Sequence, residues 1–493
     1  MTTSLILALD IGTSSVRAAL YDGRGNVVFG SMVKTERTLE TTDDGGAEID
    51  AEMALKQIVE TIDRVLEKSD NLTANISHVA VSSFWHSLVG VDTTGKPTTK
   101  VLGWADTRSR EHVAKLRRKF DEADVQSRTG ARFHPSFWPA KLSWMHQDRR
   151  RDFERTACWL SFSDFVSLRL CGTDSTSVSM ASATGVFDIR GCEWDVELLR
   201  YLKLKHRNLP RIATDAQTFE LLPKYQGRWP RLKAARWFPA IGDGAANNIG
   251  AGCVSASKAA LMIGTSGAMR VAYRGAPPQR IPSGLWCYRV DRERVIVGGA
   301  LSDGGGLYRW LKDNLRLDMG DDELEREIAK RPPAAHGVSF LPFIAGERGT
   351  GYHEFATGGI LGLKTATDAV DIVQAALESV AYRFAEIFEQ LAGVCDISEI
   401  VASGGALRES PVWTQVIADL LGRELTLPDT HEASSRGAVL LALESIGNID
   451  AIESTRTPKG RKFRPNRKRH ALYQEALKRH RRIYNSIIRE HTK

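Results

Sequence analysis

The 493-residue chain lacks the features that would place it in a membrane or on a secretory route. None of its apolar runs reaches the roughly 20 residues that a membrane-spanning helix needs. Its first four residues carry no basic region ahead of the first apolar run, which argues against a signal peptide. None of its six cysteines has CxxC or metal-ligand spacing, so we expect buried free thiols and a cytoplasmic location.

The composition is ordinary, but the charge is unevenly spread. Apolar residues make up 42% of the chain and charged residues 26%, as in globular proteins, and the length predicts two to four domains. Of the net charge of +7, residues 455–493 contribute +12 through fourteen Lys or Arg against two Glu, which leaves −5 for the rest. Because this basic tail matches no known nucleic-acid module, we expect a packed and solvated helix rather than a nucleic-acid partner.

Hydrophobic periodicity predicts alternating strands and helices, and therefore an α/β fold. Short apolar runs bounded by turn residues predict the strands, and apolar residues at helical spacing predict the helices. The expected strands include 5–10, 16–21, 76–82, 259–262, 268–273 and 400–402. The expected helices include 51–68, 368–392, 432–443 and 470–488.

The four-residue string IGTS occurs twice, at 11–14 and at 263–266. Each copy lies between two β-like runs, which predicts a β-hairpin with a short turn. The N–H and hydroxyl groups of such a turn can hydrogen-bond phosphate oxygens. One copy alone would indicate only a good turn. Two copies in matching contexts predict an internal duplication of a nucleotide-binding unit.

The two predicted hairpins differ by one carboxylate. Asp10 precedes the first turn, and Met262 stands at the equivalent place before the second. Magnesium prefers oxygen ligands such as carboxylates. The first hairpin can therefore hold a metal ion, whereas the second can hold only phosphate.

Three further glycine-rich turns indicate catalytic or nucleotide-binding roles. Asp243 stands between two glycines at the start of a small-residue helix, where the helix N-terminus favours the ionised carboxylate that a base requires. A simple turn followed by a helix cap is the alternative. The strings SDGGG at 302–306 and SGGA at 403–406 each follow a strand and precede a helix, which lets a nucleotide approach the backbone.

Clusters suited to a polyol lie in the first half. The string FWHS at 84–87 follows a predicted strand, and GWADTRSR at 103–110 combines an aromatic plane with a carboxylate and guanidinium groups. A third stretch, 132–141, adds more aromatic and basic residues. Each has a structural alternative, since His86 can be a hydrogen-bonded core residue and Asp106 a helix cap.

Together these motifs resemble the FGGY family of carbohydrate kinases, which is built on the actin-like (ribonuclease H-like) ATPase fold. The resemblance covers nearly the whole chain. It is carried by DIGT at 10–13, FWPAKLSW at 137–144, GDG at 242–244, GTS at 264–266, GILGL at 359–363 and SGGA at 403–406. No GxxxxGK[ST] string is present, which argues against the P-loop kinases.

The resemblance implies two domains of similar fold, at 1–245 and 246–455, with a cleft between them and a basic helical tail at 456–493. ATP would bind in the cleft, Asp243 would be the catalytic base, and Asp10 would hold Mg²⁺. The implied ATP-site residues are Asp10, Gly12, Thr13, Ser14, Gly264, Thr265, Gly305, Gly404 and Gly405. The expected sugar-site residues are Trp85, His86, Trp104, Asp106, Arg108, Arg132 and Asp243.

The expected substrate is D-gluconate, phosphorylated to 6-phosphogluconate. The stretches 84–88 and 104–108 look more like the gluconate kinases of this family than its xylulokinases, although Trp85 stands where Met is usual. The cations available for a carboxylate are Arg108, Arg110, Arg132, His134 and Lys141. A pentulose kinase for xylulose or ribulose is the alternative within the family. From another class, the alternative is an actin- or chaperone-like ATPase with no sugar substrate. The sequence leaves the oligomeric state open, with a homodimer as one arrangement.

Overall fold

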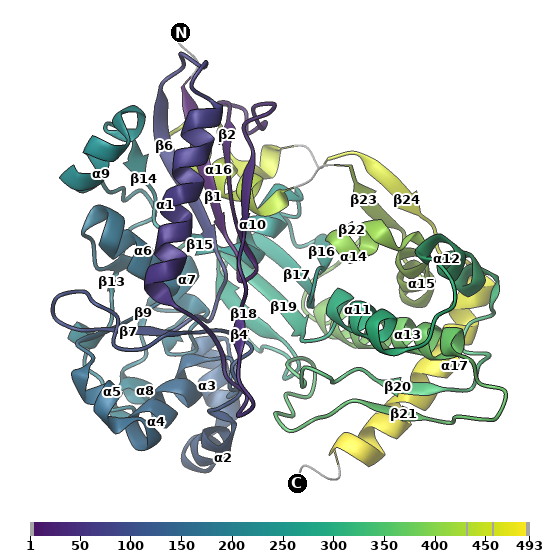
Figure 1. Cartoon of the computed structure of the whole chain (residues 1–493). Coiled ribbons are helices and arrows are strands. Elements are labelled where there is room, and N and C mark those ends of the chain that lie inside the picture. The colour runs from purple at the N-terminus through teal and green to yellow at the C-terminus, as the bar shows by residue number, and fades with distance from the viewer. Residues whose placement is uncertain (1–3, 430–431, 456–457, 490–493) are drawn as a thin grey trace.

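The computed structural model describes residues 4–429, 432–455 and 458–489 and has two α/β halves that lie side by side (Figure 1). The sheet of the first half has the strand order β14-β6-β1-β2-β3, and β15 also pairs with β6. Its strands are β1 (Leu5–Ile11), β2 (Ser15–Tyr21), β3 (Val33–Glu36), β6 (Ile76–Ser83), β14 (Arg236–Trp237) and β15 (Ile241–Gly242).

The sheet of the second half repeats the centre of the first. Its strand order is β18-β19-β17-β16-β22-β23-β24. In each sheet an antiparallel hairpin, β1–β2 or β16–β17, has its first strand paired in parallel with a later strand, β6 or β22. The predicted duplication of the hairpin is therefore confirmed. The strands are β16 (Lys258–Ile263), β17 (Gly267–Arg274), β18 (Trp286–Arg289), β19 (Arg294–Leu301), β22 (Glu399–Ser403), β23 (Leu425–Pro428) and β24 (Gly460–Phe463).

The long predicted helices are present close to their expected bounds. They are α1 (Ala51–Lys68), α13 (Ala369–Ala392) and α16 (Ala433–Ser445). The side chain of Asp50 caps α1 by accepting the Met53 N–H, and Asp368 begins α13 with a capping box. The apolar stripe of α13 is largely buried, but residues 373–385 are buried on every side, so the helix is more enclosed than the periodicity predicts.

Smaller elements surround the two sheets. Beside the first sheet lie a three-stranded sheet and a lobe of short helices. They are β4 (Glu40–Thr41), β5 (Ala47–Ile49), β8 (Val101–Leu102), α2 (Arg110–Lys119), α3 (Glu122–Thr129), α4 (Trp138–Asp148), α5 (Arg150–Arg155), α6 (Phe162–Cys171), α7 (Val178–Ser182), α8 (Val196–Tyr201) and α9 (Pro223–Arg228). The second half adds α11 (Gly305–Asn314), α12 (Asp321–Lys330), β20 (Ser339–Leu341), β21 (Gly359–Leu361), α14 (Gly405–Glu409) and α15 (Pro411–Leu421).

Two helices join the halves. Helix α10 (Asp243–Gly250) packs against α16, and α16 also contacts β6 and β1 of the first sheet. The crossing is close because each helix offers a glycine to the backbone of the other. A Cβ on Gly437 would lie 1.8 Å from the carbonyl oxygen of Ala246, and one on Gly250 would lie 1.8 Å from that of Ala433. The small residues that the sequence places in both helices are therefore required by this contact.

The basic tail is packed on the second half, but it begins with a strand that the sequence analysis did not predict. Strand β24 pairs antiparallel with β23 at the sheet edge. Helix α17 (Arg467–Tyr484) then packs on α15 and α13. The helix starts three residues before the expected bound because the Asn466 side chain caps it. Residues 456–457 and 490–493 of the predicted tail lie outside the described residues.

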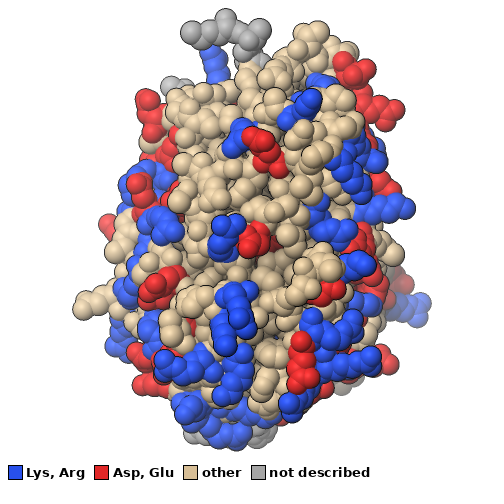
Figure 2. Space-filling view, turned by 90° about the vertical axis from the view of Figure 1, so that its left-hand side faces the viewer, with Lys and Arg blue, Asp and Glu red and all other residues tan. Residues whose placement is uncertain are grey.

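Surface and thiol chemistry agree with the composition in most respects. Among the described residues, no helix is long and apolar enough to cross a membrane. All six cysteines are free, but only Cys253, Cys287 and Cys395 are buried and the other three are partly exposed. On the face of the first half seen in Figure 2, basic and acidic side chains are interspersed. Exposed ion pairs of the first half include Arg150 and Glu154, 2.7 Å apart. This face is a mixed-sign solvated surface.

The glycine contact between α10 and α16 predicts a specific stability effect. Replacing Gly437 with Ala forces a methyl group against backbone, so the free energy of unfolding should fall by about 1–3 kcal/mol. The matched control is Gly227→Ala in α9, where a Cβ meets no atom within 4 Å. Chemical denaturation should show a lower midpoint for Gly437→Ala only. Equal midpoints for the two variants would show that the helix crossing tolerates a wider spacing.

Candidate functional site

Asp243 is held by the glycines on either side of it. Gly242 ends the short strand β15, and α10 begins at Asp243. The indole of Trp85 packs against both glycines, because a Cβ on Gly242 would lie 1.7 Å from Trp85 Nε1 and one on Gly244 2.4 Å from Trp85 Cζ3. Trp85 is only 5% exposed, and its indole N–H donates to the carbonyl oxygen of Ser179 over 3.1 Å. The two glycines of the GDG string therefore leave room for the buried indole of Trp85, which fixes the position of the Asp243 carboxylate.

The pKa of Asp243 lies above the ordinary value of a carboxyl group, although the helix N-terminus favours the ionised form. Burial raises the pKa of this half-buried carboxyl to about 6, against the opposing charge of Arg270 and with a smaller contribution from Asp10. Desolvation thus outweighs the helix N-terminus, which was expected to keep the group ionised. A carboxylate with a pKa near 6 is still ionised at neutral pH and is a better proton acceptor than an exposed one.

Asp10 lies at the end of β1, close to the other carboxylate. It is 6% exposed, accepts a hydrogen bond from the Ser82 hydroxyl, and is paired with Arg17 Nη1 at 3.3 Å. Arg17 also approaches Glu432, just before α16, at 3.5 Å. This chain of charges links the first hairpin to the second half of the molecule. The sequence analysis did not single out Arg17.

The second half brings its predicted phosphate-binding residues together. The Gly305 N–H donates to the carbonyl oxygen of Gly264 over 2.8 Å, and the Gly306 N–H to that of Thr265 over 2.9 Å. Gly404 has a φ of 100° and lies so close to Ile263 that a Cβ would meet its carbonyl oxygen at 2.1 Å. Three separate turns therefore meet at one place. A Cβ on Gly264 would lie 3.7 Å from its nearest neighbour, so packing does not require this glycine and it leaves room for a ligand.

The turn of the first hairpin is well ordered. The Gly12 N–H donates to the carbonyl oxygen of Ser15, and Arg37 Nη1 donates to that of Gly12. Thr13 and Ser14 lie at the bend, where their side chains are partly or fully exposed. Hydroxyl groups at an exposed bend are available to a phosphate. A nucleotide-binding role for these residues stays a prediction.

His86 follows β6 in a strained backbone conformation, with a φ of 68°. Its Nδ1–H donates to the carbonyl oxygen of Ala183 over 2.7 Å, which leaves Nε2 as an acceptor. Burial, and then the charge of Arg348, hold the pKa of His86 well below its ordinary value. A neutral imidazole with an unprotonated Nε2 can accept a hydrogen bond from a sugar hydroxyl.

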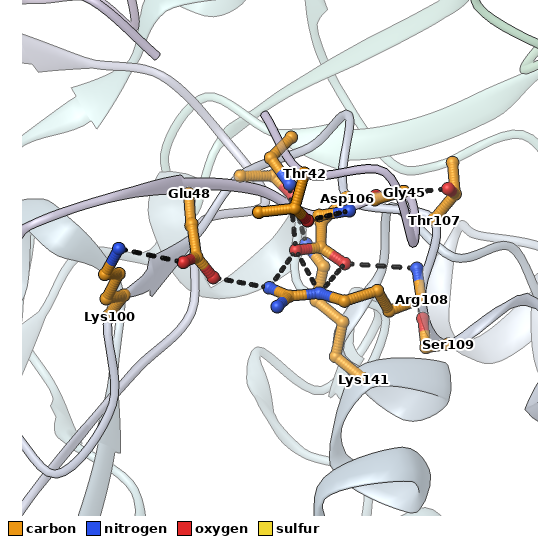
Figure 3. A network of polar contacts seen from close by, with 12 residues as sticks. Thr42, Gly45, Glu48, Lys100, Asp106, Thr107, Arg108, Ser109 and Lys141 are labelled. Atoms are coloured by element: carbon orange, nitrogen blue, oxygen red, sulfur yellow. Dashed lines mark hydrogen bonds and ion pairs between the residues drawn. The ribbon is translucent and has the colours of Figure 1, made fainter. Parts of the chain in front are cut away.

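Asp106 and Arg108 bind each other in a closed network (Figure 3). Arg108 donates to both carboxylate oxygens of Asp106 and pairs with Glu48 at 2.7 Å, while Lys100 approaches Glu48 from the other side at 3.0 Å. The backbone N–H of Ala47 also donates to Asp106, which is only 1% exposed. The network ties β5 to the turn before α2. Arg108 was expected to face the substrate carboxylate, but its charge is matched within the protein.

Of the other predicted cations, Lys141, His134 and Arg132 have polar partners, whereas Arg110 is exposed and lies over the ring of Phe355. Lys141 is fully buried, and its Nζ donates to the carbonyl oxygens of His86, Gly103 and Ser136 at 2.7–3.0 Å. Burial lowers the pKa of Lys141 to about 7 and that of His134 to about 3. Arg132 is paired with Glu122. Most of the cationic side chains that the sequence suggests for a substrate carboxylate therefore bind groups within this lobe instead.

The structure brings five residues of the second half into the same region, and the sequence analysis missed all of them. Trp286 and Tyr288 of β18 stack on each other at 4.2 Å, and both meet the Trp85 ring edge-on. Arg348 lies over the ring of Trp104 at 4.9 Å. Their neighbours Arg270 of β17 and Tyr352 complete the set.

The five second-half residues carry several hydrogen-bonding groups that have no partner among the described residues. The buried groups without a partner among the described residues include Nε and Nη1 of Arg270, Nε1 of Trp286 and the hydroxyls of Tyr288 and Tyr352. Such groups usually have a partner in a complete assembly. The one sequence signal was Arg270, a charge inside the apolar run at 268–273. Arg348 and Tyr352 come from an irregular segment that only the fold brings here.

Glycine-rich turns suited to phosphate, a carboxylate with a raised pKa, and aromatic and polar groups around it are what a phosphotransferase acting on a hydroxyl acceptor needs. Residues 5–228 match the N-terminal domain of the FGGY family of carbohydrate kinases, and residues 259–445 match its C-terminal domain. The chain therefore belongs to this family and is an ATP-dependent carbohydrate kinase.

Individual relatives agree with this family. A gluconokinase of Bacillus subtilis (strain 168) is 28% identical over 476 residues, which are 94% of this chain and 91% of the relative. Solved structures of a gluconate kinase and of a ligand-bound xylulose kinase from Lactobacillus acidophilus both have a TM-score of 0.89 at 24% identity. They cover 99% and 98% of this chain and 98% of each neighbour. The expected fold of two actin-like domains is confirmed.

The raised pKa of Asp243 predicts the pH dependence of the reaction. A base must be deprotonated, so kcat/KM should be constant at high pH and fall as the pH drops through about 6.

Asp243→Asn should lower turnover by roughly 10²–10⁴ and leave ATP binding almost intact.

The control for the pH profile is Asp303→Asn, because burial raises the pKa of Asp303 to about 7. The acid limb should persist in Asp303→Asn. If the limb vanished in that variant, or if Asp243→Asn turned over normally, Asp243 would not be the base.

Proposed function

We propose that this kinase phosphorylates D-gluconate to 6-phosphogluconate, using ATP with Mg²⁺. The observation that carries the proposal is the charge of the pocket around Asp243. Among the described residues, Arg270 and Arg348 have no ion-pair partner, whereas Arg108 and Arg132 are neutralised by neighbouring carboxylates. Arg270 acts on the charge of Asp243, whereas Arg348 forms no ion pair within the described part of the chain, and a site with one such guanidinium group suits an anionic polyol better than a neutral one.

Arg348 is the proposed partner of the substrate carboxylate. Its guanidinium lies over the indole of Trp104, which holds it in place by a cation–π contact and leaves its N–H edge available. Burial lowers the pKa of Arg348, so a bound carboxylate would relieve a desolvated charge. A neutral ketose would leave that charge unpaired.

The polyol hydroxyls find donors and acceptors on both halves. His86 Nε2 is an acceptor from the first half, and the hydroxyls of Tyr288 and Tyr352 and the indole N–H of Trp286 come from the second. The stacked rings of Trp286 and Tyr288 are 3% and 0% exposed, so they would offer an apolar surface to the C–H groups of the substrate once the halves open. A substrate that contacts both halves favours their closure, which excludes water from the phosphate.

The reaction follows from the positions of Asp10 and Asp243. Asp243 takes the proton of the attacking hydroxyl, whose oxygen then bonds to the γ-phosphorus while the bond to the ADP oxygen breaks. Asp10 would hold Mg²⁺, directly or through water, together with the phosphates. This ion usually takes one or two carboxylates and completes its shell with phosphate and water, so the carboxylates present fit it. The turns at 264–265 and 404–405 would hold the phosphates.

A pentulose kinase is the second candidate, because the xylulose kinase of Lactobacillus acidophilus has the same TM-score as the gluconate kinase. An aromatic site with a carboxylate base can serve either substrate. The unmatched Arg348 favours the acid.

A substrate screen and one charge substitution test the proposal. Gluconate should be phosphorylated with a higher kcat/KM than xylulose, ribulose, glycerol or fuculose in a coupled ADP-release assay. Arg348→Gln should lower kcat/KM for gluconate by roughly 10- to 100-fold, because a charge-assisted bond contributes about 1.5–3 kcal/mol. Arg132→Gln is the matched control, since Arg132 already has Glu122 as its partner. It should affect gluconate far less.

Two results would contradict the proposal. One is equal activity on xylulose and gluconate with Arg348→Gln affecting both alike. The other is a selective loss on gluconate in Arg132→Gln, which would return the carboxylate to the site expected from the sequence.

A further inference from the structure

The segment at 346–353 connects the proposed sugar site to the end of the chain. It lies between β20 and β21 and carries Arg348 and Tyr352 toward the region of Trp104 and His134. It contains no regular secondary structure, so its conformation depends on the side chains that hold it. The Glu347 side chain makes most of the contacts that hold this segment.

The carboxylate of Glu347 is completely buried and fully bonded. The backbone N–H groups of Gly351 and His353 each donate to it over 3.2 Å, which curls the segment around its own side chain. Arg383 of α13 forms an ion pair with it. The Tyr484 hydroxyl lies 2.8 Å from both carboxylate oxygens. Four donors thus surround one buried charge.

Tyr484 is the last residue of α17, the helix of the basic tail. Its ring packs on Phe343 at 5.8 Å and lies under the guanidinium of Arg383 at 4.4 Å. The contact with the segment is so close that a Cβ on Gly351 would lie 2.0 Å from the Tyr484 hydroxyl. The glycine at 351 is therefore needed for the tyrosine to reach Glu347.

The main chain of Glu347 faces the other way, toward the first half. Its carbonyl oxygen accepts a hydrogen bond from Nε2 of His134 over 3.1 Å, and the Ser136 N–H donates to Nδ1 of the same ring. The next residue is Arg348. One residue therefore joins α17 through its side chain, the first half through its carbonyl group, and the proposed carboxylate site through its neighbour.

We propose that Tyr484 is a positioning residue for the sugar site, and that α17 sets the affinity for sugar by holding Glu347. This explains why the last residue of a basic helix packed on the second half places its hydroxyl against a buried carboxylate 137 positions earlier in the chain. The inference rests on the placement of Arg348 in the sugar site, but not on gluconate being the sugar. It is therefore tested with whichever sugar the wild-type enzyme phosphorylates best.

The test is Tyr484→Phe, which keeps the ring and its packing and removes only the hydroxyl. The sugar KM should rise roughly tenfold, the effect of losing one hydrogen bond to a charged group, while kcat and the ATP KM change by less than about twofold. The matched control is Tyr473→Phe, which removes the hydroxyl of another buried tyrosine on α17, remote from Glu347. It should leave the sugar KM unchanged.

A second measurement does not depend on activity. The amides of Gly351 and His353 donate to Glu347, so their hydrogen exchange should accelerate in Tyr484→Phe and not in Tyr473→Phe. Glu347→Gln should raise the sugar KM as well, and the double variant should cost less than the sum of the two single changes.

Three outcomes would overturn the proposal. They are an unchanged sugar KM in Tyr484→Phe, equal increases in the sugar and ATP KM values, or the same increase in Tyr473→Phe as in Tyr484→Phe. Failure of gluconate as a substrate would not count against it, because that result concerns the proposed function alone.

Discussion

The structure depends on keeping one carboxylate, that of Asp243, half-buried where the two halves meet. Burial alone would favour its protonated form, and the opposing charge of Arg270 limits this, which leaves a pKa of about 6. Trp85 fixes the position of the carboxylate by packing on the glycines at either side. Helix α10, which starts at Asp243, then crosses α16 through a glycine contact that allows no larger residue. The proposed base is therefore held close to the helix contact that joins the halves.

The guanidinium and ammonium groups around the proposed sugar site divide into two sets. Those of Arg108, Arg132 and Lys141 are matched by carboxylates or carbonyl oxygens, and they hold the lobe together. Those of Arg270 and Arg348 come from the second half and have no such partner among the described residues. In the proposed function, the second half binds the charge of the substrate, while the first half provides His86 and the turn before Asp243 brings the proposed base. Binding of an acid would draw the halves together.

Much of the fold could be predicted from the sequence because it depends on local patterns. The IGTS turns lie between apolar runs whose strands pair as expected, and α1 and α13 begin at acidic caps close to the predicted bounds. Strand β24 was missed because a short basic edge strand has no apolar alternation to indicate it.

The site was less predictable, because its chemistry depends on which charges meet across long distances in sequence. Composition revealed the cations of 103–141 but not their partners, such as Glu48 and Glu122. It could not reveal that Arg348, on an irregular segment of the second half, lies over Trp104. The glycines around Asp243 were read as a turn and a helix start, whereas their role in seating Trp85 needed the tertiary structure.

The most direct test of the proposed function is a crystal structure of the enzyme with gluconate and a non-hydrolysable ATP analogue. The account predicts that the terminal hydroxyl lies within hydrogen-bond distance of the Asp243 carboxylate and that the gluconate carboxylate is bound by Arg348. A sugar acid bound with its carboxylate at Arg108 or Arg132, or with no hydroxyl near Asp243, would contradict it.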